Sequence, residues 1–365
     1  MNFSVRRDSL LNILSRISGV VDKNNSKEII SYLNISTQEN SIKFMATDLD
    51  IAIFASLDAT ILQSGEVKIS VYTLHSIVKK LSGELIVTFT FTDQGKLLIS
   101  CGNSYFSLPN LISNHYPSLE EDNFKFQFSI LKTALIDLLN KTKFAISLDD
   151  TRYNLNGIYL HTDHQFLYSV ATDGHRLSCI KTIKPKNINS NFGVIIPRKT
   201  VLELLKISND CNDIHIKLSE RKILFICNKY ILISKLIDGH FPNYISFIHI
   251  NHDKHVVIDS NTLSDVIERV SVILYDKVKA ITLSLQFNLL TLYAQTQDSS
   301  DSRESIPIDY NNLPIKIGLN ARYLLDALSC INNKCKIQFT DDTHPIIITD
   351  EDDSHALYII MPMRI

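Results

Sequence analysis

The residues with the clearest potential for chemistry in this sequence lie in one short segment. Asp173, His175 and Ser178 are the residue types of a Ser-His-Asp hydrolase. In such a triad the histidine lies between the nucleophile and the carboxylate that orients it, and three neighbours on one loop cannot converge in that way. The sequence also lacks a nucleophile elbow, a phosphate-binding loop, a zinc-protease helix and a dinucleotide fingerprint. We therefore expect no enzyme and no catalytic residue.

Histidine and cysteine do not indicate a metal or a cofactor either. The 12 histidines show no spacing typical of metal ligands. Cys330 and Cys335 are close in sequence but have no His or Cys partners at zinc-like spacing. The six cysteines are Cys101, Cys179, Cys211, Cys227, Cys330 and Cys335. We expect no cofactor, no metal, and unpaired thiols in a reducing compartment.

The elements around these residues form a repeat. Two apolar stripes with the i, i+3, i+4, i+7 spacing of an amphipathic helix each occur three times, at intervals of 123 to 128 residues. The first stripe is Leu10, Ile13, Leu14, Ile17, then Leu135, Leu138, Leu139, Thr142, then Leu263, Val266, Ile267, Val270. The second is Leu74, Ile77, Val78, Leu81, then Val201, Leu204, Leu205, Ser208, then Leu324, Ala327, Leu328, Ile331. A period near 125 is the size of a domain rather than of a solenoid repeat.

Alternating segments around the helices predict many strands. Examples are 85–91, 97–101, 166–171, 222–227 and 289–294. Each third reads as two units of strand, helix and further strands, which is typical of a mostly antiparallel α+β fold. Polar stretches near 120–123 and 251–254 place the boundaries, so we expect three domains at 1–125, 126–252 and 253–365.

One loop also repeats, and then changes. Ala46–Asp50 corresponds at an offset of 125 to Ala171–His175, and Tyr116-Pro117 corresponds to Phe241-Pro242. The third copy has the polar run 298–304 in place of the loop. We therefore expect the middle copy to carry a site that the others lack.

Charge is distributed unevenly over the predicted helices. The chain carries a net charge of −2, which is no simple nucleic-acid signature. The six predicted helices (6–16, 72–81, 130–143, 197–207, 259–270 and 320–331) nevertheless hold thirteen basic and seven acidic residues. The third copy is the exception, with more acidic than basic residues on its helices. Either these are ordinary solvated faces, or the helices bind a phosphate backbone.

No segment indicates a membrane protein or a secreted one. No apolar run reaches the ~18 residues needed to span a bilayer. The first residues, Met1 to Asp8, have no signal-peptide core behind their charges. We expect a soluble, cytoplasmic protein.

Three motifs, taken in order, suggest a family. They are Ala171–Leu177 (ATDGHRL), Lys235–Tyr244 (KLIDGHFPNY) and the C-terminal Met361–Ile365 (MPMRI). Together with the length and the threefold repeat, they resemble the bacterial DNA polymerase III beta subunit, the sliding clamp of replication. Each motif is weak alone, but the three in order are specific, and the resemblance covers the whole chain.

The resemblance implies a three-domain clamp fold and a head-to-tail homodimeric ring, with helices inside and antiparallel sheets outside. It implies a processivity factor that encircles double-stranded DNA without reading its sequence, loaded by an ATP-dependent clamp loader. The expected protein partners are the polymerase III alpha subunit, the clamp loader, and other polymerases and repair proteins that carry short apolar clamp-binding peptides. The chain would thus be a non-catalytic subunit of a DNA-directed DNA polymerase (transferase) holoenzyme.

The family's partner-peptide groove carries over to matching positions on the second and third domains. The expected groove residues are Leu155, Thr172, Gly174, His175, Arg176, Leu177, Pro242, Asn320, Tyr323, Met361, Pro362, Met363 and Arg364. Methionines repack around varied ligands, Gly174 permits a tight loop, and the stem of Arg176 can arch over the site. Ser246, Phe247 and Val278 depart from the family pattern, so the groove is expected to differ in shape.

The resemblance also assigns DNA-facing and dimer-interface residues. The expected DNA-facing residues are Arg6, Arg7, Lys79, Lys80, Lys132, Lys141, Arg152, Tyr153, Arg198 and Lys199. The expected interface residues are Lys96, Phe106, Leu108, Val272, Ile273, Asp298, Asp301 and Glu304. Asn103 and Tyr105 stand where basic residues are expected opposite the acidic run, so we expect an interface held mainly by apolar contact. The alternative to a DNA clamp is a repeat scaffold that binds proteins only.

Overall fold

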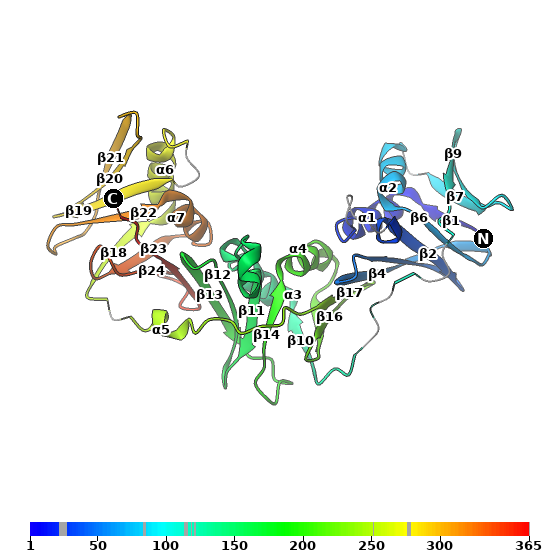
Figure 1. The fold of residues 1–365 in the computed structure, drawn as a ribbon, viewed down its shortest axis with the longest axis horizontal. Helices are drawn as coiled ribbons and strands as arrows, with labels where there is room; N and C mark the ends of the chain where they lie inside the picture. Colours follow the sequence, from blue (N-terminus) through cyan, green and yellow to red (C-terminus); the bar gives the residue numbers. More distant parts are fainter. Residues whose placement is uncertain are drawn as a thin grey trace. The chain divides into compact units, whose positions relative to one another are not determined.

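The chain folds into two compact units of strands and helices (Figure 1). The structure is a computed structural model, and it describes residues 1–21, 28–82, 85–112, 116–117, 119, 122–250, 252–275 and 279–364. Unit 1 comprises residues 1–136, 185–189 and 196–237, and unit 2 comprises 137–184, 190–195 and 238–365. The division falls inside α3 and β14, so the middle repeat contributes to both units.

Unit 1 contains a five-stranded sheet, β5-β1-β7-β8-β9, and an eight-stranded sheet, β10-β15-β16-β17-β4-β3-β2-β6. All described pairings in them are antiparallel. Its elements are β1 (Asn2–Arg6), α1 (Arg7–Ile17), η1 (Glu28–Ser31), β2 (Tyr32–Gln38), β3 (Ser41–Thr47), β4 (Ile51–Asp58), β5 (Thr60–Gln63), β6 (Glu66–Ser70), α2 (Val71–Lys80), β7 (Ile86–Phe91), β8 (Lys96–Cys101), β9 (Ser104–Pro109), β10 (Phe126–Leu131), α4 (Arg198–Ile207), η4 (Ser208–Asp210), β15 (Asp213–Leu218), β16 (Lys222–Cys227) and β17 (Tyr230–Lys235).

Unit 2 contains a second eight-stranded sheet, β14-β11-β12-β13-β25-β24-β23-β18, and a four-stranded sheet, β21-β20-β19-β22. Its elements, with the two that the division crosses, are α3 (Lys132–Asn140), η2 (Lys143–Ala145), η3 (Asp150–Leu155), β11 (Gly157–Thr162), β12 (Phe166–Thr172), β13 (Arg176–Ile183), β14 (Gly193–Pro197), α5 (Ile245–Ile248), β18 (Lys254–Asp259), α6 (Ser260–Ser271), β19 (Ala280–Gln286), β20 (Leu289–Gln295), β21 (Asp301–Pro307), β22 (Ile315–Asn320), α7 (Ala321–Leu328), β23 (Lys334–Phe339), β24 (Ile346–Asp350) and β25 (Ala356–Ile360).

The six predicted helices are present, each within a few residues of its expected bounds. Every residue of both stripes is buried except Ile77 and Leu205, which are half-buried. Side chains explain three of the helix starts, because the Ser70, Asp259 and Asn320 side chains accept hydrogen bonds from backbone N–H groups of the first turn. Pro197 ends β14 instead of entering α4. The short helix α5 was not expected.

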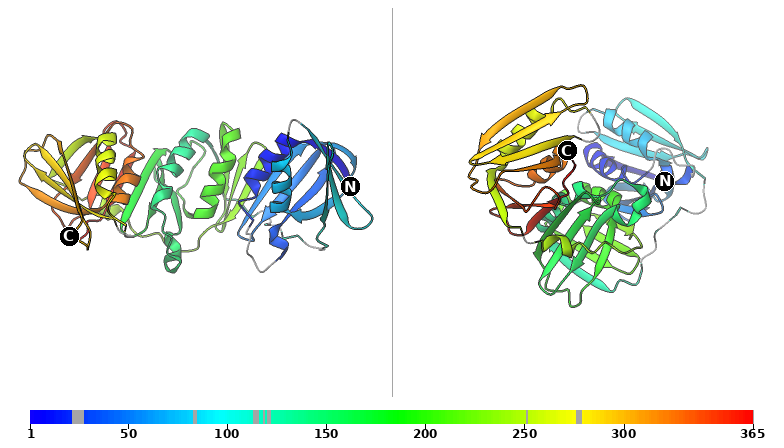
Figure 2. Two further views of the ribbon diagram at one scale, coloured as in Figure 1. Left: turned by 90° about the horizontal axis from the view of Figure 1, so that it is seen from above. Right: turned by 60° about the vertical axis from the view of Figure 1, so that its left-hand side comes forward.

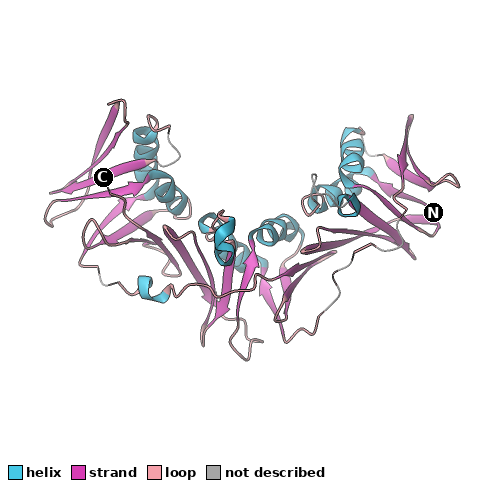
Figure 3. Cartoon of the chain, viewed as in Figure 1, coloured by secondary structure: helices cyan, strands magenta, loops and turns pink. Residues whose placement is uncertain are grey.

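Within each unit, paired helices cover one face of strands. Helices α1 and α2 lie side by side over the strands of unit 1, and α6 and α7 do the same in unit 2 (Figures 2 and 3). The stripes supply the buried side of these layers, so the apolar cores lie between helices and sheets. No helix in the described ranges is long and apolar enough to cross a membrane.

The expectation that all cysteines are unpaired is wrong for one pair. Cys211 and Cys227 form a disulfide, with 5.7 Å between their Cα atoms. The antiparallel pairing of β15 with β16 returns the chain to the end of α4, and so brings together two cysteines 16 residues apart in sequence. The other four cysteines are free thiols, three of them buried.

Candidate partner-binding groove

The T-D-G-H loop is a tight turn between β12 and β13 that is held by its own side chains. Thr172 Oγ1 donates to the Arg176 carbonyl at 2.7 Å and accepts from Gly174 N at 3.0 Å. Asp173 Oδ1 accepts from the backbone N–H groups of His175 and Arg176. Gly174 has φ = 88°, in the left-handed region that favours glycine. The threonine, aspartate and glycine thus fix the loop, while His175 is exposed.

The first copy of the loop, in unit 1, has the same hydrogen bonds. Thr47 Oγ1 donates to the Ile51 carbonyl and accepts from Leu49 N, and Asp48 Oδ1 accepts from two backbone N–H groups. Leu49 has φ = 82°, as Gly174 does at the matching position. The two loops differ in the residue that follows them, which is Ile51 in one and Arg176 in the other. The repeat therefore preserves the loop and changes the side chain that the loop presents.

Arg176 joins the loop to α7 and η2. Its Nε donates to Asp173 Oδ2 at 3.0 Å, Nη1 donates to Asp326, and Nη2 donates to the Phe144 carbonyl at 2.6 Å. The guanidinium also lies over the ring of Tyr323, 4.3 Å from its centroid. Only 10% of the side chain is exposed. Arg176 therefore links its own loop to Tyr323 and Asp326 of α7 from a largely buried position.

The C-terminal segment lies against this loop. Met361 N donates to the His175 carbonyl at 2.8 Å, directly after β25 has paired with β13. Met363 N donates to the Gly318 carbonyl at 2.8 Å, so the segment also joins β22. Asn320 ends β22 and caps α7, which carries Tyr323. Half-buried methionines and a proline thus lie between the loop and α7.

The strap that follows β17, residues 238–250, carries the predicted groove residue Pro242. Tyr244 belongs to a buried cluster with Leu177 and Ile359, and Phe241 and Ile248 pack against this cluster. Pro242 lies between Phe241 and Tyr244 and is exposed. Ser246 and Phe247 lie on α5, and both are exposed. The predicted groove position Val278 lies outside the described residues.

Most of the predicted groove residues are therefore brought together in unit 2. Thr172, Arg176, Leu177, Tyr323 and Met361 are linked by strand pairing, hydrogen bonds or stacking. Leu155 ends η3 and is buried, and Arg364 is exposed beyond Met363; among the described contacts neither joins this network. Sequence reasoning missed Asp326 and Phe144, which hold Arg176. Asp326 could have been identified from its i, i+3 spacing with Tyr323 on α7.

The candidate hydrolase residues do not converge. Ser178 is fully buried and donates to the Lys141 carbonyl at 2.6 Å. Asp173 is occupied by the loop and by Arg176, and the His175 side chain is exposed. Among the residues that the structure describes, no group of three or more His, Cys, Asp or Glu side chains is placed to hold a metal.

The predicted DNA-facing residues divide into two groups. Arg6, Lys79, Lys80 and Arg198 are exposed, and no carboxylate within the described ranges forms an ion pair with them; Lys132 is half-buried and Tyr153 is exposed. The others have internal partners: Arg7 with Asp8 and the Val78 carbonyl, Lys141 with Asp137 and Asp353, Arg152 with Asp149, and Lys199 with Asp48.

Lys141 is an example of a predicted DNA-facing residue whose charge is paired within the chain. Its Nζ lies 3.1 Å from a carboxylate oxygen of Asp137 and 3.1 Å from one of Asp353. Burial lowers the pKa of Lys141, but the hydrogen bonds to the two carboxylates outweigh burial and raise it overall. The charge of Lys141 is therefore balanced inside unit 2.

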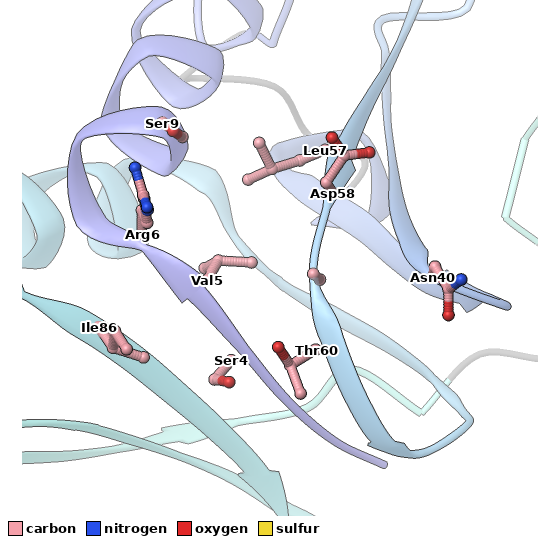
Figure 4. A pocket seen from close by; sticks show the side chains of 10 residues that line it. Ser4, Val5, Arg6, Ser9, Asn40, Leu57, Asp58, Thr60 and Ile86 are labelled. Atoms are coloured by element: carbon pink, nitrogen blue, oxygen red, sulfur yellow. The ribbon is translucent and has the colours of Figure 1, made fainter.

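Arg6 lines a polar hollow of about 630 Å³ in unit 1. Figure 4 shows Arg6 at the end of β1 and Ser9 in the first turn of α1, with Asp58 at the end of β4 and Thr60 at the start of β5 opposite them. The third repeat has a matching hollow of about 740 Å³ at the start of α6, where Asp259 and Asp309 are the charged residues. A hollow that recurs with different charged residues is a feature of the repeated fold, and does not indicate one ligand.

The predicted interface residues lie on or near the edge strands. Phe106 and Leu108 lie half-buried on β9, and Lys96 is exposed at the start of β8. Val272 is 68% exposed just after α6, and Ile273 is half-buried. Asp298 and Asp301 are exposed, whereas Glu304 on β21 forms a two-bond ion pair with Arg269 of the same chain.

Three models of one protein family match nearly the whole chain. They describe the DNA polymerase III beta subunit: its N-terminal domain matches residues 1–120, its central domain 129–243 and its C-terminal domain 246–364. The chain belongs to the DNA polymerase III beta subunit family. Its members are sliding clamps, which are processivity factors without catalytic activity. The fold is accordingly α+β with three clamp domains.

Individual relatives agree with this assignment. The chain is 32% identical to the beta sliding clamp of Caulobacter vibrioides over 372 residues, covering 100% of both. It is 34% identical to the beta sliding clamp of Rickettsia felis over 379 residues, covering 99% of both. Among solved structures, a sliding clamp from Bartonella birtlesii bound to griselimycin is 33% identical with a TM-score of 0.97, and one from Caulobacter crescentus is 32% identical with a TM-score of 0.94; each match covers 100% of both chains.

Proposed function

We propose that two copies of this chain close head to tail into a ring that encircles duplex DNA. Each copy tethers a replicative polymerase and other clients through the groove of unit 2. The observation that carries the proposal is the meeting of the T-D-G-H-R loop, the C-terminal Met-Pro-Met segment and the start of α7 in one surface. The proposal keeps the three domain boundaries near residues 125 and 252.

The sheet edges support closure of a ring. In the described pairing, β9 ends the five-stranded sheet and β21 ends the four-stranded one. Each presents unpaired backbone groups along one side, which is a template for pairing with another chain. Placing β9 of one copy beside β21 of the other would join two sheets, and a twofold axis would repeat the contact.

Apolar side chains would hold this contact more than ion pairs would. Phe106 and Leu108 on β9 would meet Val272 and Ile273, which follow α6. Glu304 already has Arg269 as a partner, so it offers little net charge to a neighbour. Lys96 opposite the exposed Asp298 and Asp301 is the remaining charge complement across the joint.

The DNA contact would be weak and without sequence preference. The exposed cations Arg6, Lys79, Lys80 and Arg198, with Lys132, supply a diffuse positive surface for phosphates. Base contacts worth ~1–3 kcal/mol each would hinder sliding, so a clamp is served by phosphate contacts alone. Lys141, Arg152 and Lys199 contribute less in this proposal, because carboxylates of the same chain balance them.

Clients would bind as extended peptides with apolar anchors. Met361 and Met363 are flexible, half-buried side chains that adapt to different residues, and Leu177 forms an apolar floor. Expected clients are the polymerase III alpha subunit, the clamp loader, and other polymerases and repair proteins. The cytoplasm is the expected location, because the replication machinery that such a clamp serves is there.

The test is processive primer extension on a long single-stranded circle, with the polymerase and loader of the same organism. The expected result is a large increase in product length per binding event when the chain is added with the loader and ATP. Product lengths that are the same with and without the chain would refute the proposal.

A further inference from the structure

A second hollow in unit 2 lies apart from the groove, beneath the strap 238–250. Its volume is about 390 Å³, and it lies between one face of the β11-β12-β13-β25 sheet and α5. Figure 1 shows α5 on the strap between β17 and β18. We call it the strap pocket; it is lined by His161, Asp163, Tyr168, Cys179, Lys181, Tyr244, Ile245, Ile248, His249, Ser354, His355 and Leu357. None of these is a predicted groove residue.

A ladder of stacked rings forms one wall of the strap pocket. His161 stacks between Tyr159 and Tyr168 with centroid distances of 4.7 and 4.8 Å, and Tyr159 stacks in turn on Phe241 at 4.9 Å. Tyr159 and His161 lie on β11, Tyr168 lies opposite His161 on β12, and Phe241 comes from the strap. Cross-strand aromatic pairs of this kind stabilise a sheet. The strap pocket therefore offers flat, preformed aromatic surface.

The polar groups of this wall already form hydrogen bonds within the protein. His161 Nε2 and the Tyr244 hydroxyl lie 2.6 Å apart. Burial lowers the pKa of His161 to about 4, so its ring is neutral near pH 7. Asp163 accepts from Tyr168 Oη at 2.8 Å and from two backbone N–H groups. Burial raises the pKa of the Cys179 thiol to about 12, so this group is also uncharged.

Lys181 lines the strap pocket, and its positive charge is available to a ligand. Its Nζ lies 4.7 Å from the centroid of the Phe166 ring, and no described carboxylate forms an ion pair with it. His249 and His355 lie exposed at the rim, and His355 contacts Asp353. A hollow of this size, lined by aromatic, aliphatic and polar side chains, can hold a small molecule. The cation selects for an acid group on the ligand.

We propose that the strap pocket binds a small planar aromatic anion, with its ring against the Tyr168 and Tyr244 side and its acid group on Lys181. The site goes beyond the clamp function, because none of its lining residues is among the predicted groove residues. The ligand class is an aromatic ring that carries a carboxylate, sulfonate or phosphate.

The probe is anilinonaphthalene sulfonate, titrated into the full-length protein and followed by its own fluorescence. The chain has 14 Tyr and no Trp, so excitation of tyrosine gives a second signal, through energy transfer to a probe beside Tyr168 and Tyr244. Saturable binding of one probe per chain with transfer from tyrosine is the expected result. Absence of saturable binding to the folded protein would overturn the proposal.

Two substitutions locate the probe. Lys181→Gln is expected to weaken its binding about tenfold, the effect of losing one charged hydrogen bond. Lys186→Gln removes an exposed lysine that does not line the pocket and is expected to leave binding unchanged. Phenylnaphthylamine, which has the same rings without the sulfonate, is expected to bind both variants equally.

Ile245→Asp tests the strap side of the pocket. Ile245 is 52% exposed, so the substitution is compatible with folding, and its carboxylate would repel the anionic probe. The expected result is at least a tenfold loss of probe affinity, with binding of an apolar clamp-binding peptide retained. Unchanged affinity in both Lys181→Gln and Ile245→Asp would place the probe elsewhere and overturn the proposal.

Discussion

Arg176 lies over the ring of Tyr323, with its guanidinium carbon 4.3 Å from the ring centroid. The same guanidinium forms ion pairs with Asp173 of its own loop and with Asp326 on α7. Two segments 150 residues apart in sequence thus share one largely buried cation. The shape of the proposed groove is expected to depend on this cation.

Arg176→Ala is therefore expected to destabilise unit 2 and to weaken client binding together. Removing one partner of a buried, hydrogen-bonded ion pair costs about 3 kcal/mol, because carboxylates are left without their cation. Denaturant unfolding followed by circular dichroism measures the loss. Arg152→Ala is the control, since its pair with Asp149 is exposed and worth less than about 1 kcal/mol. Equal effects of the two substitutions would contradict the role given to Arg176.

Deleting residues 361–365 is expected to abolish polymerase and loader binding and to leave the dimer intact. The deletion begins after β25 ends at Ile360, so the eight-stranded sheet of unit 2 keeps all its strands. It removes the methionines and the Met361–His175 hydrogen bond. Pull-down with client peptides and sedimentation of the same sample give the two readouts. A truncated protein that still binds both partners would refute the groove assignment.

The sequence predicted the helices and the T-D loops well because both are local patterns. The stripes follow the 3.6-residue period, and Thr172 and Asp173 bond to groups within four residues. The interactions that cross long distances could not be predicted in this way. The link from Arg176 to Asp326, the neutralisation of Lys141 by Asp353, and the Cys211–Cys227 disulfide all depend on which strands pair.

The proposed dimer is expected to resist salt. Its core is Phe106, Leu108, Val272 and Ile273, and apolar contacts are not screened by ions, whereas exposed ion pairs are. Sedimentation at about 0.1 M and about 0.5 M NaCl should give the same dimer. Leu108→Asp is expected to produce monomer, and Lys96→Ala to change the dimer little. Dissociation of the wild-type protein at the higher salt would contradict an apolar interface.

His161 is expected to make unit 2 less stable in mild acid, because burial favours its neutral form. Burial lowers its pKa from 6.5 to about 4, so the unfolded chain binds a proton at a higher pH than the folded chain does. The stability that His161 contributes is complete above pH 6.5 and is lost as the pH falls from 6.5 towards 4. Unfolding midpoints measured across this window should fall less for His161→Gln than for wild type, with His249→Gln as the exposed control. Identical slopes for wild type and His161→Gln would contradict this.

The most direct test of a ring that encloses DNA is retention on a nicked circle. The labelled protein is loaded with clamp loader and ATP, freed of loader by gel filtration at moderate salt, and followed before and after one cut that linearises the circle. If the ring is held on DNA because it encloses the duplex, the protein stays with the circle and is released after the cut. Retention on the linear product, with its ends unblocked, would show binding by affinity and contradict the account.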